Sequence, residues 1–311
     1  MKQFLVVIFL SLYSTVSFGA DKLTVLLDWF TNPDHAQLII AQELGYFADQ
    51  DLEIEMIEPT DPSLPPKMVA AGNADIAITY QPQLHVQISE GLPLVRFGTL
   101  VSTPLNSLVV LKDGPIKSIA DLDGKTVGFS VGGFEEALLK SMLKTHGLQL
   151  SDVELINVNF SLSPSLITGQ VDAVIGAYRN FELNQMDIEG HPGTAFYPEE
   201  HGVPVFDELI LVAHNDQRDN PALGRFMAAL QSATTYIINH QDEAWEIFKN
   251  SAPDTLDNEL NRRAWGDTLP RLALRPSAID EQRYEAFGQF MLDQGLIKSA
   301  PAVDTYTMVP R

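Results

Sequence analysis

The chain has 311 residues, no cysteine and a formal net charge of −21 at pH 7. Without cysteine it can form no disulfide scaffold, zinc ribbon or thiolate nucleophile, and it lacks the lipid-modified cysteine of bacterial lipoproteins. A chain this acidic repels phosphate backbones and anionic lipid surfaces, so we expect no nucleic acid partner. The length suffices for two domains, each with its own core.

The first residues have the pattern of a secretory signal peptide. Lys2 supplies a positive charge, residues 4–12 are mostly apolar, and Ser17 and Gly19 are small residues at the −3 and −1 positions. The apolar run is shorter than the roughly 20 residues that a spanning helix needs. We therefore expect cleavage after Gly19 and a free, soluble periplasmic protein.

Strands and helices alternate in the next hundred residues. Strands are predicted where apolar residues run or alternate, at residues 23–27, 52–57, 94–100 and 107–111. Helices are predicted at 35–47 and 82–90, and the prolines of 58–66 predict a loop. This order predicts an α/β fold with a mainly parallel sheet that helices cover on both faces.

A seven-residue phrase occurs twice, as Gly72-Asn-Ala-Asp-Ile-Ala-Ile78 and as Gly169-Gln-Val-Asp-Ala-Val-Ile175. In each copy a polar turn leads into an apolar run, which indicates a helix end followed by a buried strand. Each copy ends close to a tyrosine, Tyr80 or Tyr178. The repetition predicts two similar lobes with a ligand cleft between them. Chance recurrence of a common turn is the alternative.

A second α/β unit begins near Ile119. Its predicted helices and strands lie at residues 119–128, 134–146, 153–158, 164–168 and 181–188. Residues 209–213 predict a strand that returns the chain to the first lobe, and long helices follow. We therefore assign residues 20–111 and 206–311 to lobe 1 and 112–205 to lobe 2. Two crossing strands between them would act as a hinge.

One enzyme motif is present. Gly128-Phe-Ser-Val-Gly132 matches the G-x-S-x-G nucleophile elbow and lies between a predicted strand and helix. Asp172, Asp207 and His214 could complete a triad with Ser130. No oxyanion segment precedes the motif, and too few strands come before it. A tight turn close to the cleft is the preferred interpretation, with a hydrolase as the alternative.

Metal and cofactor motifs are absent from the sequence. The seven histidines show no metal-binding spacing, and neither the dinucleotide-binding nor the Walker glycine motif occurs. We therefore expect no metal, no cofactor and no catalytic residue.

The segment Asp28–His35 directly follows the first predicted strand, where open α/β sheets place their ligand loops. Trp29 offers a flat face to a planar ring, and Asn32, Asp34 and His35 can form hydrogen bonds. Core packing of Trp29 is the alternative.

In the second lobe, Ala177–Glu182 occupies the corresponding position. Tyr178 could stack on a ring, and Glu182 could bind an amino group through a charge-assisted hydrogen bond. A helix-start carboxylate is the alternative role for Glu182.

From Leu23 to about Ile297 the chain resembles type II periplasmic substrate-binding proteins of the thiamine-precursor group, which includes the fungal pyrimidine synthase. The resemblance rests on four segments, residues 27–35, 58–62, 121–128 and 178–182. It implies a monomeric receptor without enzyme activity, the substrate-binding component of an ABC transporter. The receptor would pass a small heteroaromatic ligand to permease subunits in the inner membrane. The implied ligand is a thiamine pyrimidine precursor, such as formylaminopyrimidine or a hydroxymethylpyrimidine.

The implied ligand-binding residues are Trp29, Asn32, His35, Tyr80, Tyr178, Asn180 and Glu182. The aromatic rings would face or edge the pyrimidine, Glu182 would bind its amine and a ring nitrogen, and the amides and the histidine would orient the substituent.

Departures from the synthase favour the transport branch. Its Schiff-base lysine and reacting histidine correspond to Thr79 and Gln83 here, and its cysteine cluster corresponds to Val203–Asp207. The loop Ser130–Phe134 lacks the lysine of the synthase's phosphate loop.

Three alternatives stay open. One is the same fold with riboflavin or a sulfonate-type anion, which would require Arg96 or Arg179 near the cleft. The others are the Ser130 hydrolase and a vestigial synthase.

Overall fold

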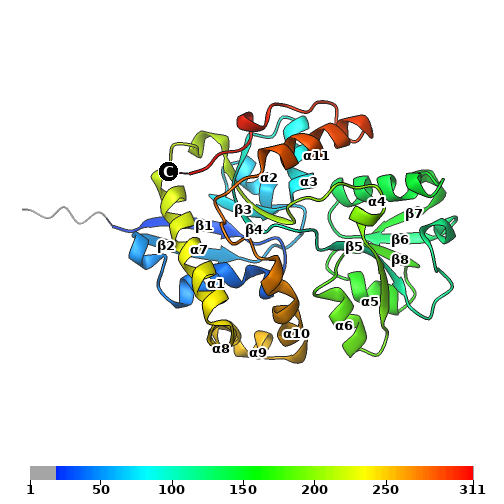
Figure 1. Cartoon of the computed structure of the whole chain (residues 1–311), viewed down its shortest axis with the longest axis horizontal. Coiled ribbons are helices and arrows are strands. Elements are labelled where there is room, and N and C mark those ends of the chain that lie inside the picture. Colours follow the sequence, from blue (N-terminus) through cyan, green and yellow to red (C-terminus); the bar gives the residue numbers. More distant parts are fainter. Residues whose placement is uncertain (1–18, 311) are drawn as a thin grey trace, which may run out of the picture.

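Two five-stranded sheets form the framework of the protein. The computed structural model describes residues 19–310, and Figure 1 shows the sheets in two separate lobes. The first sheet has the order β2-β1-β3-β10-β4 and is made of β1 (Asp21–Leu26), β2 (Leu52–Ile57), β3 (Ile76–Thr79), β4 (Leu94–Val101) and β10 (Leu209–His214). The second has the order β7-β6-β8-β5-β9 and is made of β5 (Asn106–Leu111), β6 (Thr126–Phe129), β7 (Glu154–Asn157), β8 (Ala173–Tyr178) and β9 (Gly193–Phe196). The predicted signal peptide lies outside the described residues except for Gly19.

Strand direction follows the same plan in both sheets. In the first, β1 is parallel to β2 and β3, and β10 is antiparallel to β3 and β4. In the second, β6 is parallel to β7 and β8, and β5 is antiparallel to β8 and β9. Four strands of each sheet therefore run one way and one runs against them. The predicted two-lobed, mainly parallel α/β fold is confirmed.

The repeated phrase forms the same structure in both lobes. Gly72 and Gly169 both have a φ of +73°, which closes the preceding helix at no steric cost. The Asp75 carboxylate then accepts the Thr24 N–H at 2.8 Å, and the Asp172 carboxylate accepts the Thr126 N–H at 2.9 Å. Each aspartate thus ties the start of a central strand, β3 or β8, to the neighbouring strand.

The chain passes between the lobes twice, through residues 102–105 and again just before β10. The Glu208 carboxylate joins the two crossings, since its Oε2 accepts the N–H groups of Leu105 (2.6 Å) and Asn106 (2.9 Å). Glu208 is fully buried. The Glu208 side chain therefore ties the two crossing segments to each other.

One strand, β5, belongs to a different lobe from the one to which the sequence analysis assigns it. Residues 106–111 were assigned there to lobe 1, but β5 pairs with β8 and β9 of the second sheet. Its apolar residues predict a strand correctly, whereas pairing with distant strands leaves no local signal in the sequence. The first crossing therefore precedes β5. As predicted, β10 returns the chain to the first sheet.

Helices cover both faces of each sheet (Figure 1). They are α1 (Ala36–Glu43), α2 (Pro65–Ala70), α3 (Gln81–Ser89), α4 (Phe134–Thr145), α5 (Leu162–Ile167), α6 (Glu182–Ile188), α7 (Pro221–Asn239), α8 (Gln241–Ser251), α9 (Pro253–Leu256), α10 (Glu259–Thr268) and α11 (Glu281–Asp293). In the second lobe α4 lies on one face of the sheet and α5 and α6 on the other. In the first lobe, α10 extends toward the second lobe and contacts α6.

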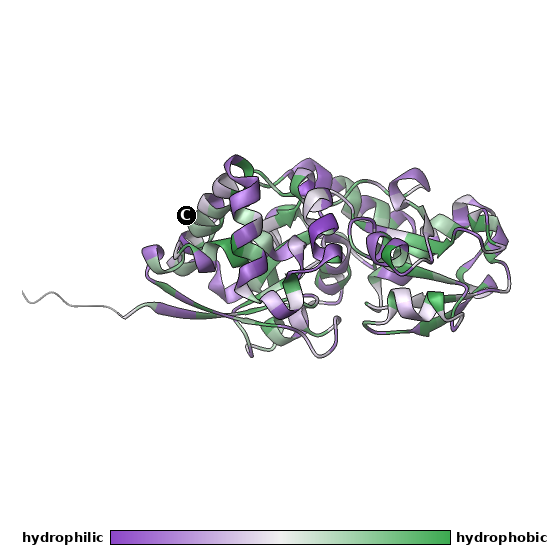
Figure 2. Cartoon of the chain, turned by 90° about the horizontal axis from the view of Figure 1, so that it is seen from below, coloured by the Kyte–Doolittle hydropathy of each residue, from purple (hydrophilic) through white to green (hydrophobic). Residues whose placement is uncertain are grey.

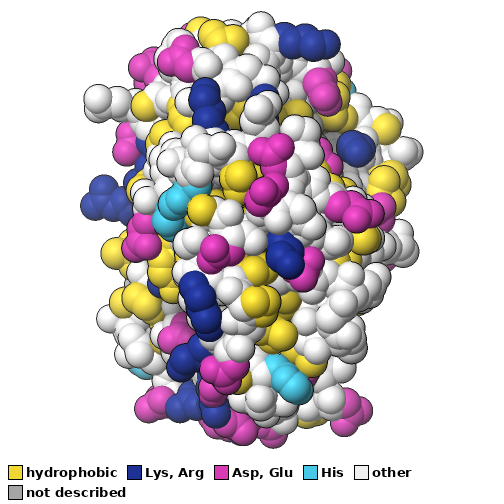
Figure 3. Space-filling view, turned by 90° about the vertical axis from the view of Figure 1, so that its right-hand side faces the viewer, with side chains coloured by type: hydrophobic (Ala, Val, Ile, Leu, Met, Phe, Trp, Pro, Cys, Tyr) yellow, Lys and Arg dark blue, Asp and Glu magenta, His cyan; other side chains and the backbone are white. Residues whose placement is uncertain are grey.

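Most of the buried side chains are apolar, and the buried polar ones include the carboxyl groups of Asp28, Asp34 and Glu208. Figure 2 shows hydrophobic residues on the strands and on the helix faces that cover them, with hydrophilic residues outside. Figure 3 shows the end of the second lobe, where basic and acidic side chains are intermingled. Among residues 19–310, no helix combines the length and the apolar character needed to cross a membrane.

Candidate ligand-binding site between the lobes

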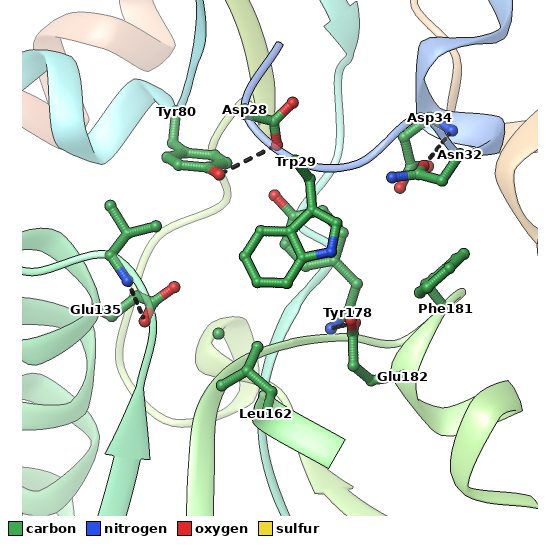
Figure 4. Close-up of a pocket in the computed structure, with 12 residues that line it drawn as sticks. Asp28, Trp29, Asn32, Asp34, Tyr80, Glu135, Leu162, Tyr178, Phe181 and Glu182 are labelled. Carbon is green, nitrogen blue, oxygen red and sulfur yellow. Dashed lines mark hydrogen bonds between the residues drawn. The ribbon is translucent and has the colours of Figure 1, made fainter. Parts of the chain in front are cut away.

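A cavity lies between the lobes and is lined by both (Figure 4). The first lobe contributes Asp28, Trp29, Asn32, Asp34 and Tyr80, and the second contributes Val131, Glu135, Leu162, Gly176, Tyr178, Phe181 and Glu182. The space between these side chains measures about 430 Å³, including the part open to solvent. Five of the seven predicted binding residues line it: Trp29, Asn32, Tyr80, Tyr178 and Glu182.

The loop after β1 is held rigid by its own side chains. Asn32 caps the 3₁₀ turn Pro33–His35, because its Oδ1 accepts the Asp34 N–H at 2.8 Å while its Nδ2 donates to the Phe30 carbonyl at 2.9 Å. His35 Nδ1 accepts the Asn32 N–H at 3.3 Å. The hydrogen of that imidazole is therefore on Nε2 when the ring is neutral.

His35 is fully buried and does not line the cavity. Its Nε2 lies 2.9 Å from Asp28 Oδ1, and Asp28 Oδ2 accepts the Tyr80 hydroxyl at 3.1 Å. The chain from His35 through Asp28 fixes the position of the Tyr80 ring. His35 thus positions cavity residues instead of facing the cavity itself.

Aromatic rings form the apolar part of the lining. Trp29 of the first lobe packs edge-on against Phe160 of the second, with centroids 4.7 Å apart. Tyr80 stacks on Phe134 across the lobes at 4.8 Å. One face of Tyr80 is therefore already covered. The Tyr178 hydroxyl is buried and has no hydrogen-bond partner among the described residues.

Four carboxylates make the cavity electronegative: Asp28, Asp34, Glu135 and Glu182. All are buried. Within the described part of the chain, no lysine or arginine lines the cavity. Burial is the first cause that raises the pKa of Asp34 to about 6, that of Glu182 to about 7 and that of Glu135 to about 8. A ligand with N–H donors or positive charge would complement this lining.

A β-bulge makes room for Glu135. Opposite β5, Ser107 faces Ala177 and Leu108 faces Ile175, so Gly176 is the extra residue. Gly176 has a φ of +104°, and a Cβ on it would collide with the Glu135 carboxylate. Glu135 Oε2 also accepts the N–H groups of Ser130 (2.8 Å) and Val131 (3.1 Å). These bonds favour the charged form and oppose the effect of burial on the pKa of Glu135.

Glu182 and Asn180 have different places in the second lobe. Glu182 begins α6 and accepts the Tyr178 N–H at 2.7 Å, so it is both a helix-start carboxylate and a cavity residue. Asn180 does not line the cavity. Its Nδ2 donates to Asp34 Oδ1 and to Thr268 Oγ1, each at 2.7 Å, and so bridges the lobes.

Sequence comparison decides the family. A family model described as NMT1/THI5 like matches residues 32–244. The chain belongs to the NMT1/THI5-like family. It is 54% identical to a thiamine biosynthesis protein of Haemophilus influenzae, over 94% of this chain and 93% of that one. It is 34% identical to the formylaminopyrimidine-binding protein of Halalkalibacterium halodurans, over 73% of this chain and 69% of that one.

Two further comparisons bear on activity and fold. The 4-amino-5-hydroxymethyl-2-methylpyrimidine phosphate synthase of Schizosaccharomyces pombe is 27% identical, over 78% of this chain and 73% of that one. A Candida albicans protein of known structure, with the generic periplasmic binding protein fold, superposes with a TM-score of 0.71 and 17% identity, covering 93% of this chain and 97% of that one. The second likeness shows the fold alone, and it is the predicted one.

The hydrolase alternative does not fit this NMT1/THI5-like chain. Ser130 Oγ donates to the Asn159 carbonyl, and its N–H donates to Glu135. Asp172 is bound to Thr126 at the base of β8, and Asp207 accepts from Arg283 at 2.5 Å. His214 ends β10 and accepts the Asp216 N–H at 3.2 Å. The proposed triad is therefore not assembled, and the hydrolase interpretation of the G-x-S-x-G motif was wrong.

The two arginines named for an anionic ligand also lie elsewhere. Arg96 is fully buried in β4 and donates to Thr99 Oγ1 at 2.6 Å and to the Ala278 carbonyl at 2.5 Å. Arg179 pairs with Glu199 at 2.6 Å. Neither lines the cavity. Within residues 19–310, no group of three or more histidine, aspartate or glutamate side chains is placed to hold a metal ion.

Asp28, Asp34 and Glu135 line the cavity although they are not among the predicted binding residues. Asp34 belongs to the predicted ligand loop, so its neighbourhood was visible in the sequence. Glu135 has the weaker signal of an acidic residue in the first turn of a helix, which usually faces solvent.

Proposed function

We propose that this protein is the substrate-binding component of an ABC transporter. It captures an aminopyrimidine precursor of thiamine in the periplasm and delivers it to permease subunits as a monomer. The 34% identity to the formylaminopyrimidine-binding protein of Halalkalibacterium halodurans supports this ligand class. The signal peptide predicted at residues 1–19 is part of the same proposal.

The observation that carries the proposal is the acidic, aromatic lining of the cavity between the lobes. An aminopyrimidine has two flat faces and an edge on which the N–H donors of the exocyclic amine lie beside ring nitrogens that accept hydrogen bonds. Trp29 and Tyr178 provide aromatic surface, and such contacts contribute about 0.5–1.5 kcal/mol beyond burial. Glu182 and Asp34 provide acceptors, and a hydrogen bond to a charged group contributes about 1.5–3 kcal/mol.

The charge of the lining argues against an anionic ligand. A sulfonate would lie among four buried acidic side chains, of which the ionised ones would repel it, with no cation of the described chain beside it. Bringing like charges together in a desolvated site is unfavourable. No feature of the cavity specifically favours riboflavin, so riboflavin serves as a test compound.

We further propose binding without chemical conversion of the ligand. The resemblance places Thr79 and Gln83 where the synthase has its Schiff-base lysine and its reacting histidine. Both side chains are buried, and neither offers an amine or an imidazole. A pyrimidine synthesis that consumes a histidine has no such donor at these positions.

Two measurements test the proposal. Native mass spectrometry of the purified protein should detect a copurifying aminopyrimidine. Calorimetric titration should give the tightest binding for formylaminopyrimidine or hydroxymethylpyrimidine, roughly 1,000-fold tighter than for riboflavin or an alkanesulfonate, the factor expected from two charge-assisted hydrogen bonds of about 2 kcal/mol each. Tightest binding of the sulfonate or of riboflavin would contradict the proposal.

A matched pair of variants locates the binding. Trp29→Ala should weaken aminopyrimidine binding about tenfold, because a ring facing the ligand is lost. Phe30→Ala removes the neighbouring aromatic ring, which is 48% exposed and does not line the cavity. Its effect should stay within about twofold.

A further inference from the structure

The lobes also meet where α6 faces α10. Three side chains form a closed triangle at the inner end of this contact. Asn180 donates to Asp34 Oδ1 and to Thr268 Oγ1, each at 2.7 Å, and Thr268 Oγ1 donates to Asp34 Oδ1 at 3.0 Å. Asn180 belongs to the second lobe, and the other two belong to the first. All three are at most 1% exposed. We call these residues the buried triangle.

The Asp34 carboxylate is divided between this triangle and the cavity. Oδ1 accepts two of the three hydrogen bonds of the triangle, and Oδ2 has no partner among the described residues although it is buried. Asp34 lines the cavity, and Figure 4 shows its carboxylate beside Asn32 at the cavity edge. A buried carboxylate oxygen without a donor costs the free energy of its lost hydration. Asp34 Oδ2 is therefore an acceptor that a ligand donor would satisfy.

We propose that Asp34 couples ligand binding to lobe closure, with Oδ2 accepting an N–H of the ligand and Oδ1 holding Asn180 of the other lobe. This inference rests on the proposed function and adds to it a role for Asp34 in joining the lobes. When the lobes separate, Asn180 leaves and water can reach Asp34. Closure on an empty cavity removes that water without replacing it, whereas closure on an amine replaces it with a hydrogen bond. The ligand thus binds the closed state more tightly and shifts the population toward it.

The outer cross-lobe contacts differ in kind and provide a control. Arg263 of α10 pairs with Asp187 of α6 at 2.7 Å, and both side chains are exposed. Exposed pairs contribute little to stability, and neither residue lines the cavity. Arg263→Ala breaks a cross-lobe contact without touching the buried triangle.

The first experiment measures how strongly the receptor prefers the amine. Wild type is titrated with an aminopyrimidine and with the same pyrimidine carrying hydrogen in place of the exocyclic amine. Asp34→Asn should weaken binding of the aminopyrimidine by about 100-fold, the factor expected when a charge-assisted hydrogen bond is lost, and binding of the analogue by less than about threefold. Arg263→Ala should change both by less than about twofold.

The second experiment measures closure directly. Small-angle scattering should show that wild type contracts when saturated with the aminopyrimidine. Thr268→Val leaves Asp34 Oδ2 intact but removes a donor to Oδ1, so it should retain the preference for the amine while lowering aminopyrimidine affinity about tenfold. The Thr268→Val variant should then contract only at a ligand concentration about tenfold higher than wild type needs. Thr268 does not line the cavity. Thr268→Val therefore tests the coupling even where Asp34→Asn is too unstable to be titrated.

The outcomes separate the two proposals. If wild type binds no aminopyrimidine, the proposed function fails and this inference fails with it. If wild type binds and Asp34→Asn retains the amine preference, or Thr268→Val closes at the wild-type ligand concentration, the inference alone is wrong.

Discussion

The two lobes share their framework and differ at the point where each central strand reaches the cavity. In β3 the chain runs without interruption from the repeated phrase through Thr79 to Tyr80. In β8 the bulge at Gly176 adds one residue. This addition explains why Tyr178 lies one residue farther from its glycine than Tyr80 does, while both tyrosines face the same cavity.

The difference shows where the two copies have diverged. The contacts that tie each strand to its neighbour, through Asp75 and Asp172, are the same. The cavity side is not, because the bulge at Gly176 gives the second lobe space for the buried Glu135 side chain. The first lobe instead supplies a rigid loop whose side chains bond to one another. Framework and binding chemistry have therefore changed independently.

Filling the bulge should have the largest effect. Gly176→Ala combines a φ of +104° with a collision against Glu135, and should lower the free energy of unfolding by about 2–4 kcal/mol and abolish aminopyrimidine binding. Gly169→Ala has only the strain of a positive φ, with no atom within 4 Å of the new Cβ, and should lower it by about 1 kcal/mol. Urea denaturation measures both. Equal losses would show that Glu135 does not depend on the bulge.

Removing the charge of Glu182, a predicted binding residue of the second lobe, should have the second-largest effect. Glu182→Gln should weaken aminopyrimidine binding by roughly 10- to 100-fold, since a neutral acceptor replaces a charged one. The same change should raise the unfolding free energy at pH 8, because burial disfavours the carboxylate. Glu189→Gln, at the exposed end of the same helix, is the control and should change neither. If calorimetry shows that Glu182→Gln binds the aminopyrimidine as tightly as wild type does, the assignment of Glu182 as a binding residue is wrong.

Stability should fall as the pH rises. Asp34, Glu182, Glu208 and Glu135 have raised pKa values in the folded protein, of about 6, 7, 7 and 8. Between the ordinary carboxyl pKa and these values the folded state binds more protons than the unfolded state, so deprotonation on raising the pH favours unfolding. The melting temperature without ligand should therefore be higher at pH 5.5 than at pH 8.5. Glu135→Gln should flatten this dependence, and a wild-type melting temperature that rises with pH would contradict it.

The smallest effect is expected at the contact that both lobes share, made by Asp75 in one and by Asp172 in the other. Asp75→Asn and Asp172→Asn each weaken one hydrogen bond to a backbone N–H and should lower the unfolding free energy by about 1 kcal/mol or less. Neither should alter aminopyrimidine affinity. Clearly unequal losses in matched denaturation curves would mean that the two copies no longer play equivalent roles.

Much of this architecture could be predicted from local patterns. The repeated phrase predicts two lobes because a Gly turn, an Asp and an apolar run are all local signals. Trp29, Asn32, Tyr80, Tyr178 and Glu182 line the cavity because each follows closely on a central strand or on β1.

What could not be predicted depends on contacts between distant segments. The sheet to which β5 belongs is decided by β8 and β9. The burial of Glu135 depends on a bulge in another strand, and that of Asp34 on residues of α10 and of the other lobe. His35 and Asn180 have the expected chemistry and lie close to the cavity, but they bond to its lining residues instead of facing the space.

The grip of Glu208 on both crossing segments determines how this molecule can move. Since one carboxylate oxygen holds the peptides of Leu105 and Asn106 from the opposite crossing, neither connection can bend far without the other. The backbones of the two crossing segments are thereby coupled at one buried carboxylate, so a displacement of either segment acts on the other.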